Sequence, residues 1–296
     1  MEPLLAVIFI ADFFSPFPQS PADTLFVEQN AFGVFQHAAK MALLPGGGFL
    51  VLDAGANAVI RYDRSFNEES RVGGFGWGET SFDHPSGLTT DGLNVYVSDE
   101  GNHRIQRFDR FLRFVSSLST RDTTYPPARF GYPAGVALSP DGDLFILDGE
   151  NLRVVVFDAG STYERTFGDA SSNNQQFRKP FKIQCVGRRI YIGDSDRILQ
   201  FDLFGNPLRV FGPGVSTGFV SFCANDSCVV AATADSLIWF STDGAPRNSV
   251  PIASIISDVP LHPVQDIALD RTTLYLLTPE KLVSFDIEPA STSKER

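Results

Sequence analysis

Cysteine, histidine and methionine are scarce in this sequence, which has 296 residues with 3 Cys, 4 His and 2 Met. No C-x-x-C pair is present, so a structural zinc site has no support. The sequence also lacks the G-x-x-x-x-G-K phosphate loop and the H-E-x-x-H zinc motif. These absences exclude the common P-loop nucleotide-binding enzymes and zinc proteases.

Long apolar runs are missing as well, and we expect no transmembrane span. The run Leu4 to Ala11 is too short to cross a bilayer. Ser20 and Ala22 resemble an export cleavage site with a mature start near Asp23, although the N-terminus has no basic residues. Residues 1–22 are therefore a candidate signal peptide or an N-terminal arm. We predict an extracytoplasmic protein, periplasmic or secreted, with a cytoplasmic protein as the alternative.

Excess positive charge is absent, since the formal net charge is −11. A broad phosphate-binding surface needs clustered Lys and Arg, so no nucleic acid partner is expected. An anionic membrane would be repelled for the same reason. One local exception is the run Arg104, Arg107, Arg110 and Arg113, which indicates either a solvated strand face or a weaker RNA or polyanion alternative.

What the chain does contain is Phe, at 27 residues, together with short β-branched runs. Residues 84–118 show the unit. Leu93 to Ser98 and Arg104 to Phe108 have the partial alternation of half-buried strands. Asp91-Gly92 is typical of a tight hairpin turn. Such a unit cannot bury its own faces, so it predicts copies beside it.

Three markers count six copies of this unit. The second strand of successive units ends at Asp53, Asp99, Asp148 and Asp194, with separations of 46, 49 and 46 residues, and then at Thr233 and Thr278. The third strand ends at Tyr62-Asp63, Phe108-Asp109, Phe157-Asp158, Phe201-Asp202, Phe240-Ser241 and Phe285-Asp286. The first hairpin turns at Gly46-Gly47, Asp91-Gly92, Asp141-Gly142, Val186-Gly187, Asn225-Asp226 and Asp270-Arg271. Such a period, with several short strands, predicts the blades of a propeller.

Residues Asp99 to Asp109, DEGNHRIQRFD, and Pro133 to Asp158 closely resemble the NHL-repeat family. The resemblance extends more loosely over about residues 30–286. It implies an all-β, six-bladed β-propeller of four-stranded antiparallel blades, which we place at residues 23–287 as a single domain. Residues 288–296 form a polar C-terminal tail. Propellers of this kind include enzymes, protein-binding modules and RNA-binding modules, so the resemblance leaves the activity open.

The last unit has only three predicted strands, at Asp266–Leu269, Thr273–Leu277 and Lys281–Asp286. Open sheet edges invite aggregation. We therefore predict that Thr24 to Gln29 pairs onto the sixth blade as its fourth strand and closes the ring.

The recurring Asp residues are interpreted as structural, because a residue found at the same turn in several units is a turn former that accepts backbone N–H groups. Asp99 is expected to pair with Arg104, and Asp148 with Arg153, across their turns. A buried strand-end carboxylate is tolerated mainly when it is paired in this way.

Three histidines stand at equivalent positions where a chain enters its unit: His37, His84 and His262. Closing the ring makes their units neighbours, so the imidazoles could converge at the mouth of the central channel and bind a metal ion. The alternative is ordinary loop chemistry. Peptidylglycine amide lyases, which this chain resembles in fold, carry their zinc-binding His after the Pro. Ser86, Ala134 and Val264 stand at those positions here, which departs from the lyase pattern.

Cys223 and Cys228 form a candidate disulfide. If Asn225-Asp226 is a two-residue turn, the two Cys face each other at a spacing that a disulfide spans. Reduced, packed thiols are the alternative reading. Cys185 is left over as a small core residue.

Loops of unequal length surround one face of the predicted ring. The first three units have five residues between the strand-end Asp and the next apolar residue, and the last three have three. Aromatic and His side chains suit a protein or peptide surface there, and the candidates are Phe75, Trp77, Tyr125, Tyr132, His84 and His103. We expect a monomeric, non-catalytic binding scaffold without a cofactor. The alternative is a metal-dependent lyase or hydrolase at the channel mouth.

Overall fold

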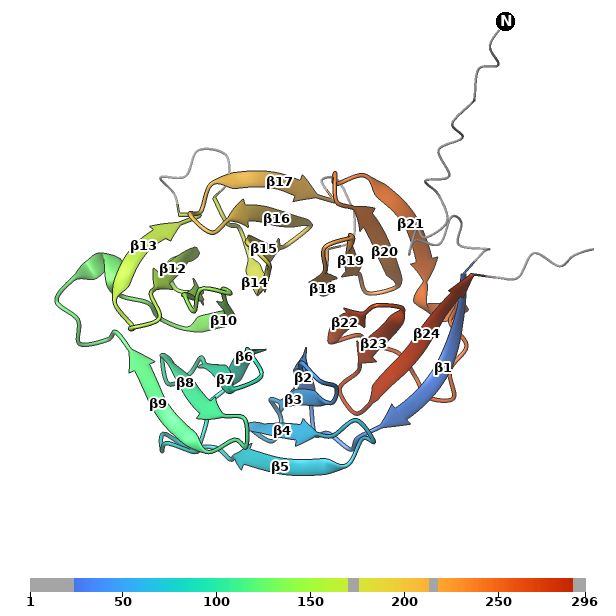
Figure 1. The fold of residues 1–296 in the computed structure, drawn as a ribbon, viewed down its shortest axis with the longest axis horizontal. Helices are drawn as coiled ribbons and strands as arrows, with labels where there is room; N and C mark the ends of the chain where they lie inside the picture. Colours follow the sequence, from blue (N-terminus) through green and yellow to red (C-terminus); the bar gives the residue numbers. More distant parts are fainter. Residues whose placement is uncertain (1–23, 170–175, 213–217, 290–296) are drawn as a thin grey trace, which may run out of the picture.

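The computed structural model describes residues 24–169, 176–212 and 218–289, and these form a ring of six four-stranded sheets around a central axis (Figure 1). Every sheet is antiparallel, and each is connected to the next around the ring. The predicted six-bladed β-propeller is confirmed. The candidate signal segment, residues 1–22, lies outside the described residues, as does the tail from residue 290 onward.

The blades follow the predicted repeat. Blade 1 contains β2 (Ala38–Leu43), β3 (Phe49–Asp53), β4 (Ala58–Tyr62) and β5 (Glu68–Gly73), and blade 2 contains β6 (Pro85–Thr90), β7 (Asn94–Asp99), β8 (Arg104–Asp109) and β9 (Phe114–Ser119). Blade 3 contains β10 (Pro133–Leu138), β11 (Leu144–Asp148), β12 (Arg153–Phe157) and β13 (Tyr163–Phe167), and blade 4 contains β14 (Pro180–Val186), β15 (Arg189–Asp194), β16 (Arg197–Asp202) and β17 (Pro207–Phe211). Blade 5 contains β18 (Ser221–Ala224), β19 (Cys228–Ala232), β20 (Ser236–Ser241) and β21 (Pro246–Pro251).

Blade 6 closes the ring in the predicted way. It contains β22 (Asp266–Asp270), β23 (Thr273–Leu277) and β24 (Leu282–Pro289), and β1 (Thr24–Phe32) pairs antiparallel with β24 as its outermost strand. Figure 1 shows β1 and β24, from opposite ends of the described chain, side by side. The closing strand is longer than expected, since it runs to Phe32, and β24 continues two residues past the expected boundary at 287.

The core consists of six apolar clusters among the described residues, one between each pair of neighbouring blades. Second strands supply much of it: β3, β11 and β19 are buried along their whole length. Outer strands such as β9 are largely exposed. This gradient explains the sequence composition, because inner and middle strands lie between two blades and need apolar side chains on both faces.

Alternating chain direction divides the connections between two ends of the ring. One end, here called the loop face, carries the turns between second and third strands and the longer connections between blades. The other end, the hairpin face, carries the turns between first and second and between third and fourth strands. The connections include the 3-10 segments η2 (Pro126–Ala128) and η3 (Ile252–Ser254). No helix among the described residues is long and apolar enough to cross a membrane.

Candidate functional site

Carboxylates at the ends of second strands anchor the loop face in blades 1 to 4. Each accepts main-chain N–H groups from the connection that enters its own blade, which confirms the structural interpretation of the recurring Asp residues. The contacts run from Gln36 and His37 to Asp53 (2.9 and 2.8 Å), from Asp83 to Asp99 (2.7 Å), from Gly131 to Asp148 (3.1 Å), and from Arg178 and Lys179 to Asp194 (2.8 and 2.6 Å). The predicted pairs are also present, with Arg104 2.7 Å from Asp99 and Arg153 3.0 Å from Asp148.

The connection from blade 1 to blade 2 forms a tightly held loop, residues 74–82, which we call the aromatic loop. Gly74 and Gly76 have φ values of +117° and +152°, which a side chain would strain, and the loop closes through hydrogen bonds between these residues and Phe82. Phe82 itself is fully buried between blades 1 and 2. The two ends of the loop are therefore held together by burial of Phe82 and by main-chain hydrogen bonds.

Side chains of blade 2 hold the carbonyl groups of the aromatic loop. The Arg104 guanidinium donates to the main-chain oxygens of Trp77 (3.0 Å), Gly78 (2.7 Å) and Ser81 (3.0 Å) while it pairs with Asp99. Further hydrogen bonds run from Asn102 Nδ2 to Gly76 O (2.9 Å) and from Gln106 Nε2 to Ser81 O (3.0 Å). Because a planar guanidinium offers five donors in fixed directions, these contacts define one loop conformation.

Two aromatic rings project from this rigid main chain into solvent. The exposed fraction is 70% for Phe75 and 77% for Trp77. The hydrogen bonds of the loop therefore secure its backbone and leave both large apolar side chains without cover in the described chain. Sequence analysis expected both residues on a binding surface, and the structure places them together on the loop face.

A second group of candidates lies on the connection from blade 2 to blade 3. Tyr125 is 56% and Tyr132 50% exposed. The Tyr132 N–H donates to His103 Nδ1 at 3.2 Å, and the two rings meet edge to face with centroids 4.1 Å apart. Burial, helped by the charge of Arg121, lowers the pKa of His103. A neutral imidazole is required for Nδ1 to accept this hydrogen bond, so the lowered pKa supports the contact.

The three histidines of the metal prediction are not brought together. Among the described residues no group of three or more His, Cys, Asp or Glu side chains could hold a metal ion. The side chain of His84 is 84% exposed and lies 2.5 Å from Asp83, its own neighbour, while His37 and His262 are also exposed. Their equivalent positions place them around the rim of the loop face, and the imidazoles do not converge on the axis. The proposed His37, His84 and His262 site is therefore wrong.

The predicted disulfide between Cys223 and Cys228 is wrong, because the register of the β18–β19 hairpin differs from the one assumed. Asn225 N–H donates to Cys228 O, so the turn falls on Asp226-Ser227 and Cys223 lies opposite Val230. The two Cys are then diagonal neighbours, whose Cα atoms in a sheet are about 7–8 Å apart, beyond the usual reach of a disulfide. Both thiols are free and buried in the cluster between blades 5 and 6. Burial raises the pKa of Cys228 to about 11, so this thiol stays protonated.

A polar layer in the central channel was missed by sequence reasoning. Each innermost strand contributes one residue to this layer. Its partner on the second strand is the residue just before the recurring Asp in blades 1 to 4, or just before Thr233 and Thr278 in blades 5 and 6. These six residues are Lys40, Gly87, Gly135, Lys182, Ser221 and Asp266. The signal was available, because two Lys occupy the same position of apolar inner strands. It is visible only when the units are aligned strand by strand.

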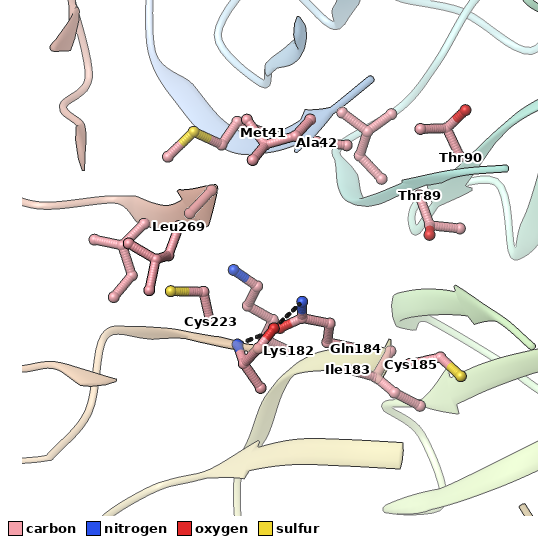
Figure 2. A pocket seen from close by; sticks show the side chains of 15 residues that line it. Met41, Ala42, Thr89, Thr90, Lys182, Ile183, Gln184, Cys185, Cys223 and Leu269 are labelled. Carbon is pink, nitrogen blue, oxygen red and sulfur yellow. Dashed lines mark hydrogen bonds between the residues drawn. The ribbon is translucent and has the colours of Figure 1, made fainter. Parts of the chain in front are cut away.

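Hydrogen bonds and an ion pair join the polar members of this layer. Lys182 Nζ pairs with Asp266 Oδ1, and Ser221 Oγ lies 2.5 Å from the same oxygen. Asp266 Oδ2 accepts the N–H of Met41 at 2.9 Å. Asp266 is fully buried. Next to the layer, a cavity of about 240 Å3 opens among the inner strands toward the hairpin face; Figure 2 shows Met41 and Ala42 on one side of it and Lys182, Ile183 and Gln184 across from them.

Comparison with known proteins agrees with the repeat. The family profile of the NHL repeat matches residues 82–108 and 130–157, which lie in blades 2 and 3. Protein brain tumor of Drosophila melanogaster is 29% identical over 149 residues, a stretch that is 48% of this chain and 14% of that protein. The match therefore spans a small part of the relative's length.

Solved structures share the fold at low sequence identity. Virginiamycin B lyase from Staphylococcus aureus aligns with a TM-score of 0.62 and 12% identity over 88% of this chain and 99% of that one. A gluconolactonase from Xanthomonas campestris aligns with a TM-score of 0.62 and 13% identity over 87% and 89% of the two chains. At these identities the likeness concerns the fold, and it transfers no active site.

Proposed function

Because this chain is an NHL-repeat six-bladed β-propeller, we propose that it is a non-catalytic scaffold that binds a protein or peptide partner through the loop face of blades 1 to 3. One observation carries this proposal. Phe75 and Trp77 are exposed by 70% and 77%, yet the loop that presents them is held by side-chain hydrogen bonds from blade 2.

The energetics of binding favour such an arrangement. Large aromatic side chains dominate the binding energy of protein interfaces. Association also costs the ordering of loops and side chains, and a loop that is rigid before binding avoids most of this cost. The aromatic loop supplies both features. Tyr125 and Tyr132 extend the aromatic surface toward blade 3.

The relative in Drosophila supports a binding role through the shared repeat, although the aligned stretch is only 14% of that protein. The acidic net charge adds that the partner's complementary surface is basic or neutral, because like charges across an interface lower the association rate.

Affinity capture with matched variants tests the proposal. The test variant is the double substitution Phe75→Ala with Trp77→Ala, and the control is Phe204→Ala. Phe204 is also 70% exposed but lies in the turn between β16 and β17, on the hairpin face. Both variants remove exposed side chains, so thermal melts of both should match that of the parent protein.

The parent protein and Phe204→Ala are expected to capture the same partner from the native source, identified by mass spectrometry. The double variant should bind the purified partner about 10- to 100-fold more weakly by surface plasmon resonance. Equal affinity of all three proteins, or no partner retained by the parent, would overturn the proposal.

A further inference from the structure

The polar layer of the channel is charged on one side of the ring only. Blades 2 and 3 contribute Gly87 and Gly135, and a Cβ atom on Gly87 would lie 2.7 Å from the Cα of Gly135. These two blades therefore meet too closely for side chains. The charged and hydroxyl groups of the layer come from the continuous arc of blades 4, 5, 6 and 1, in the order Lys182, Ser221, Asp266 and Lys40.

Positive charge exceeds negative charge in this arc. Lys40 and Lys182 face a single carboxylate, Asp266, and both oxygens of Asp266 are already engaged by other groups. Within the described part of the chain, the Lys40 ammonium forms no hydrogen bond or ion pair. An ammonium group has three N–H donors. Lys182 uses its donors toward Asp266 and toward Ser221 (3.3 Å), which leaves one, and Lys40 has all three.

Lys40 is half-buried. A cation that is partly withdrawn from water and has no counter-ion is stabilised by a nearby anion. Burial lowers the pKa of Lys40; Asp266 opposes this effect and Lys182 reinforces it. Lys182 and Asp266 are the charges that act on this amine, and the neighbouring Cys223 thiol is kept protonated because burial raises its pKa. A negative charge placed beside this amine would raise its pKa again.

The space beside Lys40 is a small hollow of about 20 Å3 that adjoins a larger cavity. The hollow lined by Lys40 and Asp266 shares Met41, Leu88, Lys182 and Ile183 with the cavity of about 240 Å3. That cavity continues along apolar side chains, Ile267 and Leu269 among them, and reaches the hydroxyl-bearing residues Thr89 and Thr90. Its volume is below the range of drug-sized pockets, which is roughly 300–1,000 Å3.

We propose that the channel is a binding site for a small organic monoanion, whose charged group is held by Lys40 and Lys182 and whose apolar body occupies the adjoining cavity. The anion supplies a counter-ion for Lys40, because the oxygens of Asp266 already have other hydrogen-bond partners. Because a bound anion raises the pKa of Lys40, binding takes up protons where the pH is near or above the pKa of the free amine, and affinity falls as pH rises through that pKa. The channel site and the aromatic loop are separate, so this inference is independent of partner binding.

Calorimetric titration tests the site with hexanoate as the probe and hexanamide as its uncharged analogue. The test variant is Lys40→Met, which keeps the unbranched side chain up to its last atom and removes the amine. The Lys40 ammonium forms no ion pair among the described residues, so its removal leaves no charged partner behind and this variant is expected to fold. The control is Lys179→Met, because Lys179 is exposed on the loop face.

The parent protein and Lys179→Met should bind hexanoate at least about tenfold more tightly than hexanamide, as expected for hydrogen bonds to a charged group. Lys40→Met should bind the two alike. The heat of hexanoate binding should differ between Tris and triethanolamine buffers, which reports proton uptake. Affinity should fall by up to about tenfold for each pH unit above the pKa of free Lys40.

Three results would overturn the inference. The first is hexanoate binding no tighter than hexanamide in the parent protein. The second is undiminished hexanoate binding by a folded Lys40→Met. The third is identical heats in both buffers together with an affinity that does not change with pH.

Discussion

Blades 1 to 4 and blades 5 and 6 fasten the same architecture by different means. In the first four, a buried Asp at the end of the second strand reaches out to the connecting loop and holds its main chain. In the last two, Thr233 and Thr278 stand at that position, and their hydroxyls bond only within their own turns. The connections into blades 5 and 6 therefore lack this polar anchor.

Apolar packing takes over where the carboxylate is absent. The cluster between blades 5 and 6 is the largest of the six clusters and includes Phe26 of the closing strand β1. The ring of Phe26 lies 6.1 Å from that of Trp239 in blade 5 and 6.4 Å from that of Phe285 in blade 6. Polar anchors direct loops into one conformation, whereas apolar packing is less directional. The candidate binding loops accordingly lie on the anchored half of the ring.

The largest effect is expected from Phe26→Ala, which removes a large aromatic ring from the apolar cluster between blades 5 and 6. Substitutions of this type in a core cost about 3–5 kcal/mol. Chemical denaturation should show this loss as a lower midpoint. Leu25→Ala is the matched control, because Leu25 is the next residue of β1 and is 48% exposed; its effect should stay within about 0.5 kcal/mol. Equal effects of the two substitutions would show that packing of Phe26 between blades 5 and 6 does not stabilise the ring.

Asp99→Ala and Thr233→Val compare the two anchoring positions directly. Asp99 is fully buried and pairs with Arg104, so removing it strands a cation and several donors at a cost of about 3 kcal/mol. Thr233→Val loses only hydrogen bonds within one turn, at about 1 kcal/mol. Hydrogen exchange should show faster exchange of the aromatic loop amides in Asp99→Ala alone. Unchanged protection of that loop would contradict the anchoring role of Asp99.

The smallest expected effect on stability concerns the hairpin face, where both halves of the ring have a carboxylate that accepts hydrogen bonds within a turn. Hydrogen bonds within a turn lower the pKa of two carboxyl groups. The main donor to Asp109 is the Arg113 N–H, and the main donor to Asp243 is the Ser241 hydroxyl. A carboxyl whose pKa is lower in the folded state stabilises that state above its ordinary pKa of about 3.9, and the stabilisation is lost as pH falls through the folded value. Asp109→Asn and Asp243→Asn should therefore weaken the acid dependence of thermal stability equally. If only one substitution weakened the acid dependence, blades 1 to 4 and blades 5 and 6 would differ on the hairpin face as well.

Repetition made the blades predictable from sequence. Strand-end Asp99 and Asp148, with Arg104 and Arg153, recur in register, so their shared role could be inferred from spacing, and the missing fourth strand of blade 6 pointed to β1. The exposure of Trp77 followed from its place in a connection between blades. These features depend on local chemistry that every unit repeats.

Features that differ between blades could not be read in this way. The register of the β18–β19 hairpin depends on which residues occupy the turn, and one residue of slip separated Cys223 from Cys228. Equivalent positions of His37, His84 and His262 gave their places in the repeat but not their distances from the axis. Lys40, Lys182 and Asp266 form a layer only after the ring brings blades 4, 6 and 1 around one channel, because the interacting groups are far apart in the chain.

The pairing of β1 with β24 also has a consequence for synthesis on the ribosome. Strand β1 leaves the exit tunnel long before its partner β24, which ends at Pro289. At translation rates of roughly 5–20 residues per second, Phe26 waits on the order of 10–50 s for the groove that will cover it. Ring closure therefore has to wait until β24 has been made, and chaperones that shield exposed aromatic segments would act during this interval.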